Sequence, residues 1–264
     1  MYKRYLLALL SCLALNAGAA RAGQTCEQNP PSAEMVGKGI AMAVKTVGQL
    51  NAGDAQVVII GRVGQDLRKY KQHYSHLGFA YRQGTGKEAA WTIVHKLNEC
   101  GTALSNIYEQ GMGQFFLDDP FRFETAVLVP TPELQQKLLR VLTDPKRVLA
   151  EHTPDYNMLA YVWNTRYQQS NQWVLETMAM AQETSIVNRE QAQAWLKFKG
   201  YQPTVLQLGP MTRLGGRMFK ANIAFDDHPN EKRFSDRIET IGADSVFDFM
   251  QKAGMSTDYF VVSL

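Results

Sequence analysis

Apolar residues recur along this chain at two different spacings, and the way these spacings alternate limits the fold more than any other feature. A spacing of three to four residues is typical of an amphipathic helix, and a spacing of two is typical of a half-buried strand. This order favours an α+β protein in which a mostly antiparallel sheet packs with helices. Helices are predicted at 32–51, 131–142, 170–181, 188–200 and around 245–250, and strands at 57–60, 77–82, 91–97, 126–129, 218–225 and 259–262.

Individual residues set the predicted ends and faces of these elements. Ser32 is expected to cap the first helix, and Gly200 is expected to end the helix that begins at Asn188. The segment 144–165 has no clear period and is predicted to be a long loop. The first helix is predicted to bury Val36, Ile40, Val44, Val47 and Leu50, and the strand at 218–225 to bury Phe219, Ala221, Ile223 and Phe225.

The first 22 residues have the layout of a secretory signal peptide. Two basic residues precede an apolar run over 6–15, and the small residues Ala20 and Ala22 form a cleavage site. The run is shorter than the roughly 20 residues that a membrane-spanning helix needs, and no later stretch approaches that length. We therefore predict export to the periplasm or beyond, a single mature domain over 23–264, and no integral membrane segment within it.

The predicted mature chain carries balanced charge. The full sequence has 28 Lys and Arg against 25 Asp and Glu, a formal net charge of +3. Because Lys3, Arg4 and Arg21 lie in the predicted signal, 25 basic and 25 acidic residues remain after its removal. This balance gives no reason to expect nucleic acid or an anionic membrane as the main partner. The glycines lack the spacing of a nucleotide-binding loop, so no cofactor is expected.

Two cysteines, Cys26 and Cys100, remain once Cys12 is removed with the signal. In an oxidising compartment a disulfide between them is the simplest use of the pair. Such a bridge closes a long loop and contributes about 3 to 5 kcal/mol in the chain-entropy model. The alternative is two separate buried thiols. Cys100 is also the one mature cysteine near a histidine, but a nucleophilic role would exclude the bridge.

Two histidines fall on the predicted hairpin that joins the strands at 77–82 and 91–97. His76 lies at the start of the first strand, where Gly78 lets another segment approach the backbone closely. His95 lies on the second strand, so the two imidazoles are expected to face each other, one fixing the tautomer of the other. This arrangement predicts His76 as a general base and His95 as its orienting partner. The alternative is that both are structural residues of the sheet.

A nucleophile for this base is expected at the start of the predicted helix at 170–181. Ser170 opens the helix on the side that faces the core. A helix start favours negative charge by about 0.3 to 1 kcal/mol, which cannot ionise a serine hydroxyl alone. Ser170 therefore needs His76 to take its proton. The alternative is that Ser170 or Asn171 simply caps the helix.

Acidic residues offer a second, metal-dependent chemistry. Asp226, Asp227 and His228 lie side by side, and Asp118 and Asp119 precede Pro120. Together they offer oxygen and imidazole ligands, which suit several divalent metals. Adjacent aspartates before a proline are usually turns, in which the carboxylates accept hydrogen bonds from the backbone. The metal site is therefore the lesser alternative.

Four stretches resemble an uncharacterised family of exported bacterial proteins that is catalogued as a domain of unknown function. The family implies export but no activity. The stretches that carry this resemblance are 74–82, 118–124, 166–176 and 213–229.

A shorter motif, Ser75-His-Leu-Gly-Phe79, is similar to one found in circularly permuted NlpC/P60 hydrolases, which have a papain-like core. The resemblance implies that His76 is the catalytic base, that His95 is the polar residue that orients it, and that Ser170 stands where the family has its cysteine. The family attacks amide or ester bonds with a thiolate, and this chain has a serine at that position. The resemblance thus implies either a serine-dependent or an inactive form of the site.

Two functions follow as expectations. The first is an exported hydrolase with a permuted papain-like core that cleaves amide or ester bonds of an envelope component, a peptidoglycan peptide or a lipid. In it Ser170 attacks, His76 takes the proton and His95 orients His76. The second is a non-catalytic module that keeps the cleft of this fold and binds peptide, glycan or lipid in the envelope.

Overall fold

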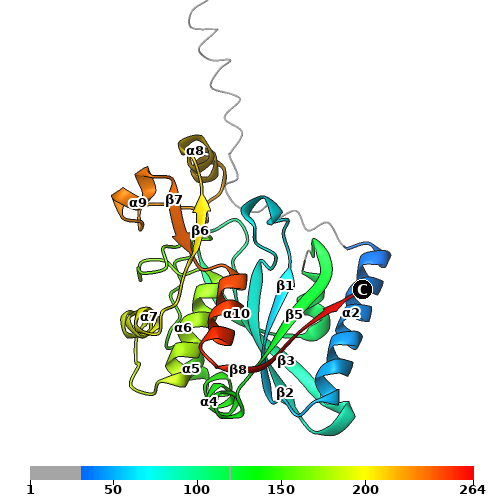
Figure 1. Cartoon of the computed structure of the whole chain (residues 1–264). Helices are drawn as coiled ribbons and strands as arrows, with labels where there is room; N and C mark the ends of the chain where they lie inside the picture. The colour runs from blue at the N-terminus through cyan, green and yellow to red at the C-terminus, as the bar shows by residue number, and fades with distance from the viewer. Residues whose placement is uncertain (1–30, 119) are drawn as a thin grey trace, which may run out of the picture.

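The computed structural model describes residues 31–118 and 120–264, and the predicted signal segment lies outside them. Its main feature is an antiparallel six-stranded sheet in the order β4-β3-β2-β1-β5-β8 (Figure 1). The strands are β1 (Val57–Val63), β2 (His76–Gln83), β3 (Ala90–Asn98), β4 (Ser105–Gly111), β5 (Arg122–Pro130) and β8 (Ser256–Ser263). The predicted α+β class is therefore confirmed, together with the hairpin that joins β2 to β3.

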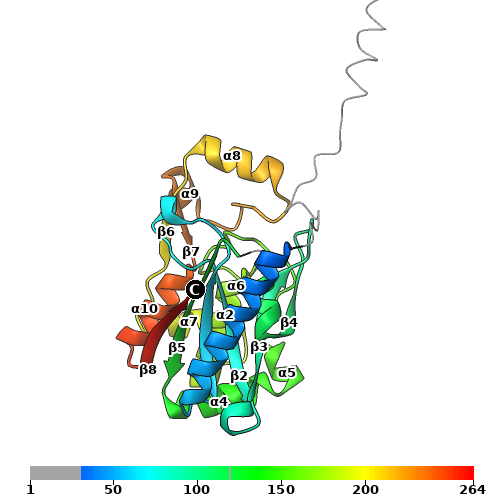
Figure 2. The ribbon, with the colours of Figure 1, turned by 90° about the vertical axis from the view of Figure 1, so that its right-hand side faces the viewer.

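One face of the sheet is covered by α2 (Ala33–Ala52), which lies across the sheet in Figure 2, and by the short helix α3 (Met112–Leu117). Ser32 caps α2 as predicted, and the predicted buried face is correct only in part. Leu50 is buried and Val47 is partly buried, but Ile40 and Val44 are exposed. The helix instead turns small residues to α3, since a Cβ on Gly39 would lie 2.5 Å from Leu117. The residues of α2 that are buried are Gly39, Met42, Ala43, Thr46 and Leu50.

The opposite face is covered by a larger group of helices around a second core. These are α4 (Pro132–Leu142), α6 (Ser170–Gln182), α7 (Arg189–Phe198) and α10 (Ala243–Lys252). Helix α6 is the central one and is buried on nearly every side. Its Trp173 packs edge-to-face on Phe79 of β2, with ring centroids 5.7 Å apart. The predicted segment 144–165 is irregular apart from the single turn α5 (Pro145–Val148).

A small lobe carries the two-stranded sheet of β6 (Thr204–Gln207) and β7 (Arg237–Thr240), with α8 (Pro210–Phe219) and α9 (Asn230–Phe234) beside it. The predicted strand at 218–225 is wrong, because α8 begins with Pro210 at its first position and runs to Phe219. The chain then turns back, so that Ile223 packs under Gly216. None of the described helices combines the length and the hydropathy needed to cross a bilayer.

The packing of α6 on the sheet yields a stability prediction. Trp173→Ala removes a fully buried indole and should lower the free energy of unfolding by about 3 to 5 kcal/mol, measured by urea denaturation. The matched control is Trp195→Ala on α7, whose indole is only partly buried and should cost less than half as much. Equal losses for the two variants would contradict this account of the core.

Candidate functional site

The two histidines predicted to meet on the hairpin are in contact. His76 Nε2 lies 2.8 Å from His95 Nδ1, and the two rings meet edge to face. His95 is fully buried and His76 is half-buried. Gly78 makes the approach possible, because a Cβ there would lie 3.1 Å from the Cβ of His95 and 3.0 Å from Ile93. The sequence therefore placed the pair correctly.

A buried arginine and an aromatic ring enclose the pair. Arg62, opposite His76 on β1, donates to the carbonyl of Phe115 and forms an ion pair with Asp118. Its guanidinium lies 4.9 Å from the centroid of the Phe115 ring, which also contacts His95. This arginine fixes a positive charge beside the two imidazoles, and nothing in the sequence pattern had identified it.

Both histidines are held neutral at neutral pH. Burial, followed by the charge of Arg62 and by His95, lowers the pKa of His76 well below its usual value. Burial and then Arg62 lower the pKa of His95 to about 4, although Asp118 and the side chain of Gln110 act in the opposite direction. A neutral imidazole keeps one nitrogen with a free lone pair, so each ring can accept a proton or a hydrogen bond.

The first turn of α6 is bound to β2 next to His76. The pairing of β2 with β3 stops at Phe79, and Leu77 N donates instead to Asn171 Oδ1 at 3.0 Å. Asn171 Nδ2 donates to the carbonyls of Ser75 and Ile241 at 3.4 and 3.3 Å. The side chain of Asn171 therefore takes the place of a strand partner on either side of His76.

Ser170 is the first residue of α6 rather than its cap. Gln169 caps the helix, since its side chain accepts a hydrogen bond from Asn171 N at 2.9 Å. The alternative in which Ser170 or Asn171 is the cap is therefore wrong. Ser170 is 5% exposed, and its Oγ lies 3.4 Å from the hydroxyl of Tyr156. Within 31–118 and 120–264, no hydrogen bond joins Ser170 to His76. The His76 ring contacts Phe115 of α3, whereas α6 packs against Phe79 on the other face of the sheet.

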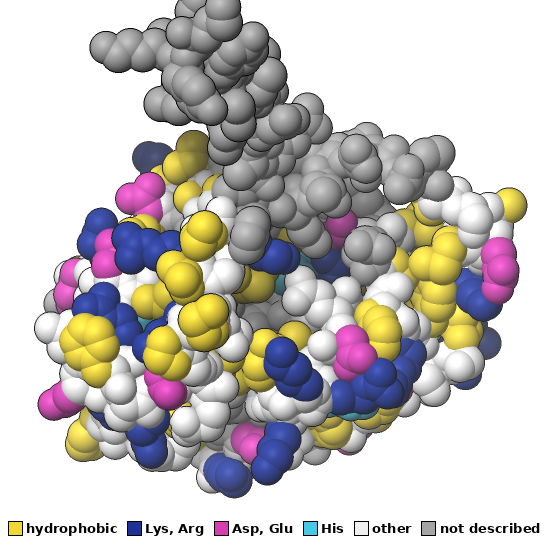
Figure 3. All heavy atoms as spheres, turned by 90° about the horizontal axis from the view of Figure 1, so that it is seen from above, with side chains coloured by type: hydrophobic (Ala, Val, Ile, Leu, Met, Phe, Trp, Pro, Cys, Tyr) yellow, Lys and Arg dark blue, Asp and Glu magenta, His cyan; other side chains and the backbone are white. Residues whose placement is uncertain are grey.

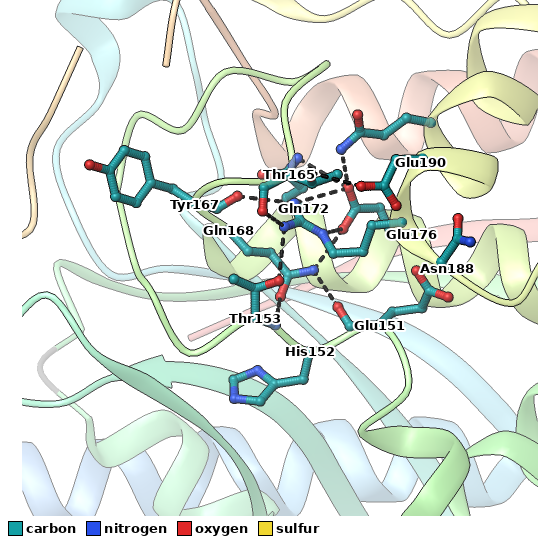
Figure 4. Close-up of polar contacts among 12 residues, drawn as sticks. Glu151, His152, Thr153, Thr165, Tyr167, Gln168, Gln172, Glu176, Asn188 and Glu190 are labelled. Carbon is teal, nitrogen blue, oxygen red and sulfur yellow. Dashed lines mark hydrogen bonds and ion pairs between the residues drawn. The ribbon is translucent and has the colours of Figure 1, made fainter. Parts of the chain in front are cut away.

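A buried polar network lies behind the start of α6 and was not anticipated (Figure 4). Its centre is Glu176, which is fully buried and paired with Arg189 of α7 at 2.8 Å. Gln168 and Gln193 donate to the same carboxylate at 2.6 and 2.8 Å. Glu176 lies four residues from Gln172 on the core side of α6. This pair of polar residues among apolar neighbours was the one sequence feature that could have indicated a buried polar network.

Arg189 and Lys96, two cations of this network, bind backbone carbonyls of the irregular segment that precedes α6. Arg189 donates to the carbonyls of Thr165 and Tyr167 at 2.7 and 3.0 Å. Lys96, fully buried on β3, donates to the carbonyl of Thr153 at 2.7 Å and to Gln168 at 3.1 Å. Burial and then the charge of Arg189 lower the pKa of Lys96 to about 7.

Three residues of the predicted metal site, Asp226, Asp227 and His228, contact other protein groups. Asp227 accepts a hydrogen bond from Tyr161 N at 2.7 Å and contacts His228 Nδ1 at 2.9 Å. The other ring nitrogen of His228 lies 3.2 Å from the carbonyl of Glu239, and Asp226 pairs with Arg166. In the part of the chain that the structure describes, no three His, Cys, Asp or Glu side chains are grouped to hold a metal ion.

The fold and this site define the class: a mixed α+β protein whose antiparallel sheet carries a neutral histidine pair beside the start of a buried helix. Residues 49–250 match the model of a family described as "Uncharacterized protein conserved in bacteria (DUF2145)". The chain belongs to this family, in agreement with the resemblance found in its sequence. Neither the curated proteins nor the solved structures contain a match to the chain.

The network predicts how stability depends on pH. Both carboxylate oxygens of Glu151 are buried without a hydrogen-bond partner among the described residues. Burial, and then the charge of Glu176, raise the pKa of Glu151 to about 7 from 4.5. Since the folded state holds this proton more tightly, the free energy of unfolding should fall as pH rises from 4.5 to 7. Glu151→Gln should remove this fall.

The measurement is urea denaturation across pH 4.5 to 8. Above pH 7 the Glu151→Gln variant should be more stable than the natural protein by about 1 to 3 kcal/mol, because the buried charge is gone. Glu88→Gln, at an exposed position, is the matched control and should leave the profile unchanged. A Glu151→Gln variant that is less stable at pH 8 would refute this view of the network.

Proposed function

We propose that this protein, once exported, hydrolyses amide or ester bonds of an envelope component such as a peptidoglycan peptide or a lipid. The observation that carries the proposal is the 2.8 Å contact between His76 Nε2 and His95 Nδ1. If His76 donates its Nε2 proton to His95, Nδ1 of His76 keeps a free lone pair and can act as the base. His95 then has the orienting role of the third member of a catalytic triad.

His76 is unprotonated at neutral pH. Burial and the nearby charge of Arg62 lower its pKa, so the basic form is the populated one. The same charge opposes the transfer of a proton from Ser170 to His76, and it favours the return of that proton to the leaving group.

Ser170 is the proposed nucleophile. Asn171, the next residue, is hydrogen-bonded to backbone groups on both sides of His76, which ties the first turn of α6 to the strand that carries the base. The His76 ring contacts Phe115 on the α3 side of the sheet, whereas α6 packs against Phe79 on the other face. Attack would therefore require the Ser170 hydroxyl to leave Tyr156 and the first turn of α6 to move around the end of β2. Oγ would bond to the carbonyl carbon while its proton moves to His76 Nδ1. The amine or alcohol would leave with that proton, and water would then hydrolyse the acyl-enzyme by the reverse path.

The similarity to circularly permuted NlpC/P60 hydrolases supports the same assignment, because base, orienting residue and helix start occur in that order along this chain. The departure is the hydroxyl in place of a thiol. A serine is less readily ionised, so the base contributes more to attack than it would with cysteine.

A second candidate is a non-catalytic module that binds peptide, glycan or lipid in the envelope. It is favoured by one specific observation: Ser170 is 5% exposed, and its hydroxyl is hydrogen-bonded to Tyr156 rather than to His76. In this candidate Ser170 has a packing role, and the histidine pair serves the sheet.

Labelling with a fluorophosphonate separates the two candidates. The hydrolase should be labelled at Ser170, and Ser170→Ala should abolish the signal. His76→Gln should slow labelling by about 10² to 10⁴-fold, because the base is lost. The labelled residue is identified by mass spectrometry of the digested protein.

Matched controls come from the same chain. Ser245→Ala removes a half-buried serine that is bonded to Tyr201, and His73→Gln removes an exposed histidine just before β2. Both should label at the natural rate. A natural protein that stays unlabelled, or a Ser170→Ala variant that still labels, would reject the hydrolase in favour of the binding module.

Export and the disulfide remain part of the proposal. Cys26 lies outside the described residues, so the bridge to Cys100 stays a prediction. Protein recovered from the periplasm should begin at Gly23, and its mass should rise by two hydrogens on reduction. Reduction should also cost about 4 kcal/mol in unfolding free energy. Two thiols that react with iodoacetamide before reduction would disprove the bridge.

A further inference from the structure

Helix α8 carries its large apolar side chains on the side that faces solvent. Met211, Leu214 and Met218 are 80%, 51% and 58% exposed. Spaced by three and four residues, they form one stripe along the helix. We call this stripe, formed by Met211, Leu214 and Met218, the α8 face.

The opposite side of α8 faces the protein. A Cβ on Gly216 would lie 3.4 Å from Ile223, so this residue marks the inner side of the helix. At about 100° per residue, Gly216 projects roughly 180° away from the middle of the α8 face. Helices of globular proteins normally turn the apolar side inward. The reversed orientation is typical of an interaction surface.

Positive charge borders the α8 face. Helix α8 has two arginines and no acidic residue. Arg213 is paired with Asp236 at 2.5 Å, but Arg217 is exposed and forms no ion pair with any described residue. On the neighbouring α9, Arg233 lies 4.8 Å from the ring centroid of Phe234, which is 70% exposed. Figure 3 looks down on this end of the molecule and shows hydrophobic side chains exposed among charged side chains of both signs.

We propose that the α8 face, together with Phe234, docks on an anionic phospholipid surface. The helix would lie in the plane of the membrane interface, with its apolar stripe among the upper acyl carbons. Arg217 would then meet the lipid phosphates, which border the apolar layer as this cation borders the stripe. This local surface coexists with a balanced total charge, and the proposal does not depend on hydrolysis.

Co-sedimentation with vesicles tests the proposal on the chain that begins at Gly23. Vesicles of phosphatidylglycerol and phosphatidylethanolamine should bind the protein, and phosphatidylcholine vesicles should bind it much more weakly. The double variant Met211→Ser/Met218→Ser should lose affinity about tenfold or more, because it removes most of the inserted surface. Arg217→Ala should lose about fivefold and show a weaker dependence on salt.

The matched control is Ile40→Ser/Val44→Ser, which removes two exposed apolar residues from α2. It should bind like the natural protein, and so should Ser170→Ala, which separates this proposal from the hydrolase. All substituted residues of α8 and α2 are exposed, and circular dichroism confirms that the variants fold.

Three results would overturn the proposal: no vesicle binding, equal binding to phosphatidylcholine, or equal losses in the α2 and α8 variants. A dimer that the α8 double variant abolishes, without vesicle binding, would likewise refute it and assign the surface to a second copy of the chain.

Discussion

The side chain of Asn171 makes the contact on which the site depends. Where the pairing of β2 with β3 ends, its amide oxygen accepts from Leu77 and its amide nitrogen donates to Ser75. A backbone donor that would otherwise be buried unpaired is thereby satisfied, and α6 is fixed to the sheet at one register. Since the neighbour of Asn171 is the proposed nucleophile and His76 lies between the two bonded backbone groups, the same contact organises the site.

The buried ion pair of Glu176 and Arg189 fixes the segment that precedes α6. Glu176 and Arg189 would be costly to bury alone, but each is satisfied by several further hydrogen bonds. Through them the irregular segment before α6 acquires a defined path although it has no regular structure. Tyr156, which holds the Ser170 hydroxyl, lies on that segment. The position of the hydroxyl therefore depends on the network as well as on α6.

Local signals predicted five of the six strands of the main sheet, the helices α2, α4, α6, α7 and α10, and the meeting of His76 with His95, because caps, periodicity and a short hairpin act over a few residues. Strand β4 and the elements of the small lobe were missed. Contacts between distant segments were beyond these signals. The buried side of α2 depends on the close approach of α3 to Gly39, which hydrophobic period alone cannot reveal. Met218 lies in a helix and not in the predicted strand. The prediction failed because the apolar spacing of 218–225 does not distinguish a strand from a helix end followed by a turn. The burial of Lys96 could not be predicted, because its partners, Thr153 and Gln168, are distant in the sequence.

The central claim is that His76 is a neutral base with Nδ1 free and Nε2 bonded to His95. Nitrogen-15 NMR of the imidazole rings, followed between pH 5 and 8, tests it most directly. The account predicts that at pH 6.5 both rings are neutral, with the His76 proton on Nε2. A charged His76 at that pH, or a His76 proton on Nδ1, would contradict the account, because neither form can take a proton from Ser170.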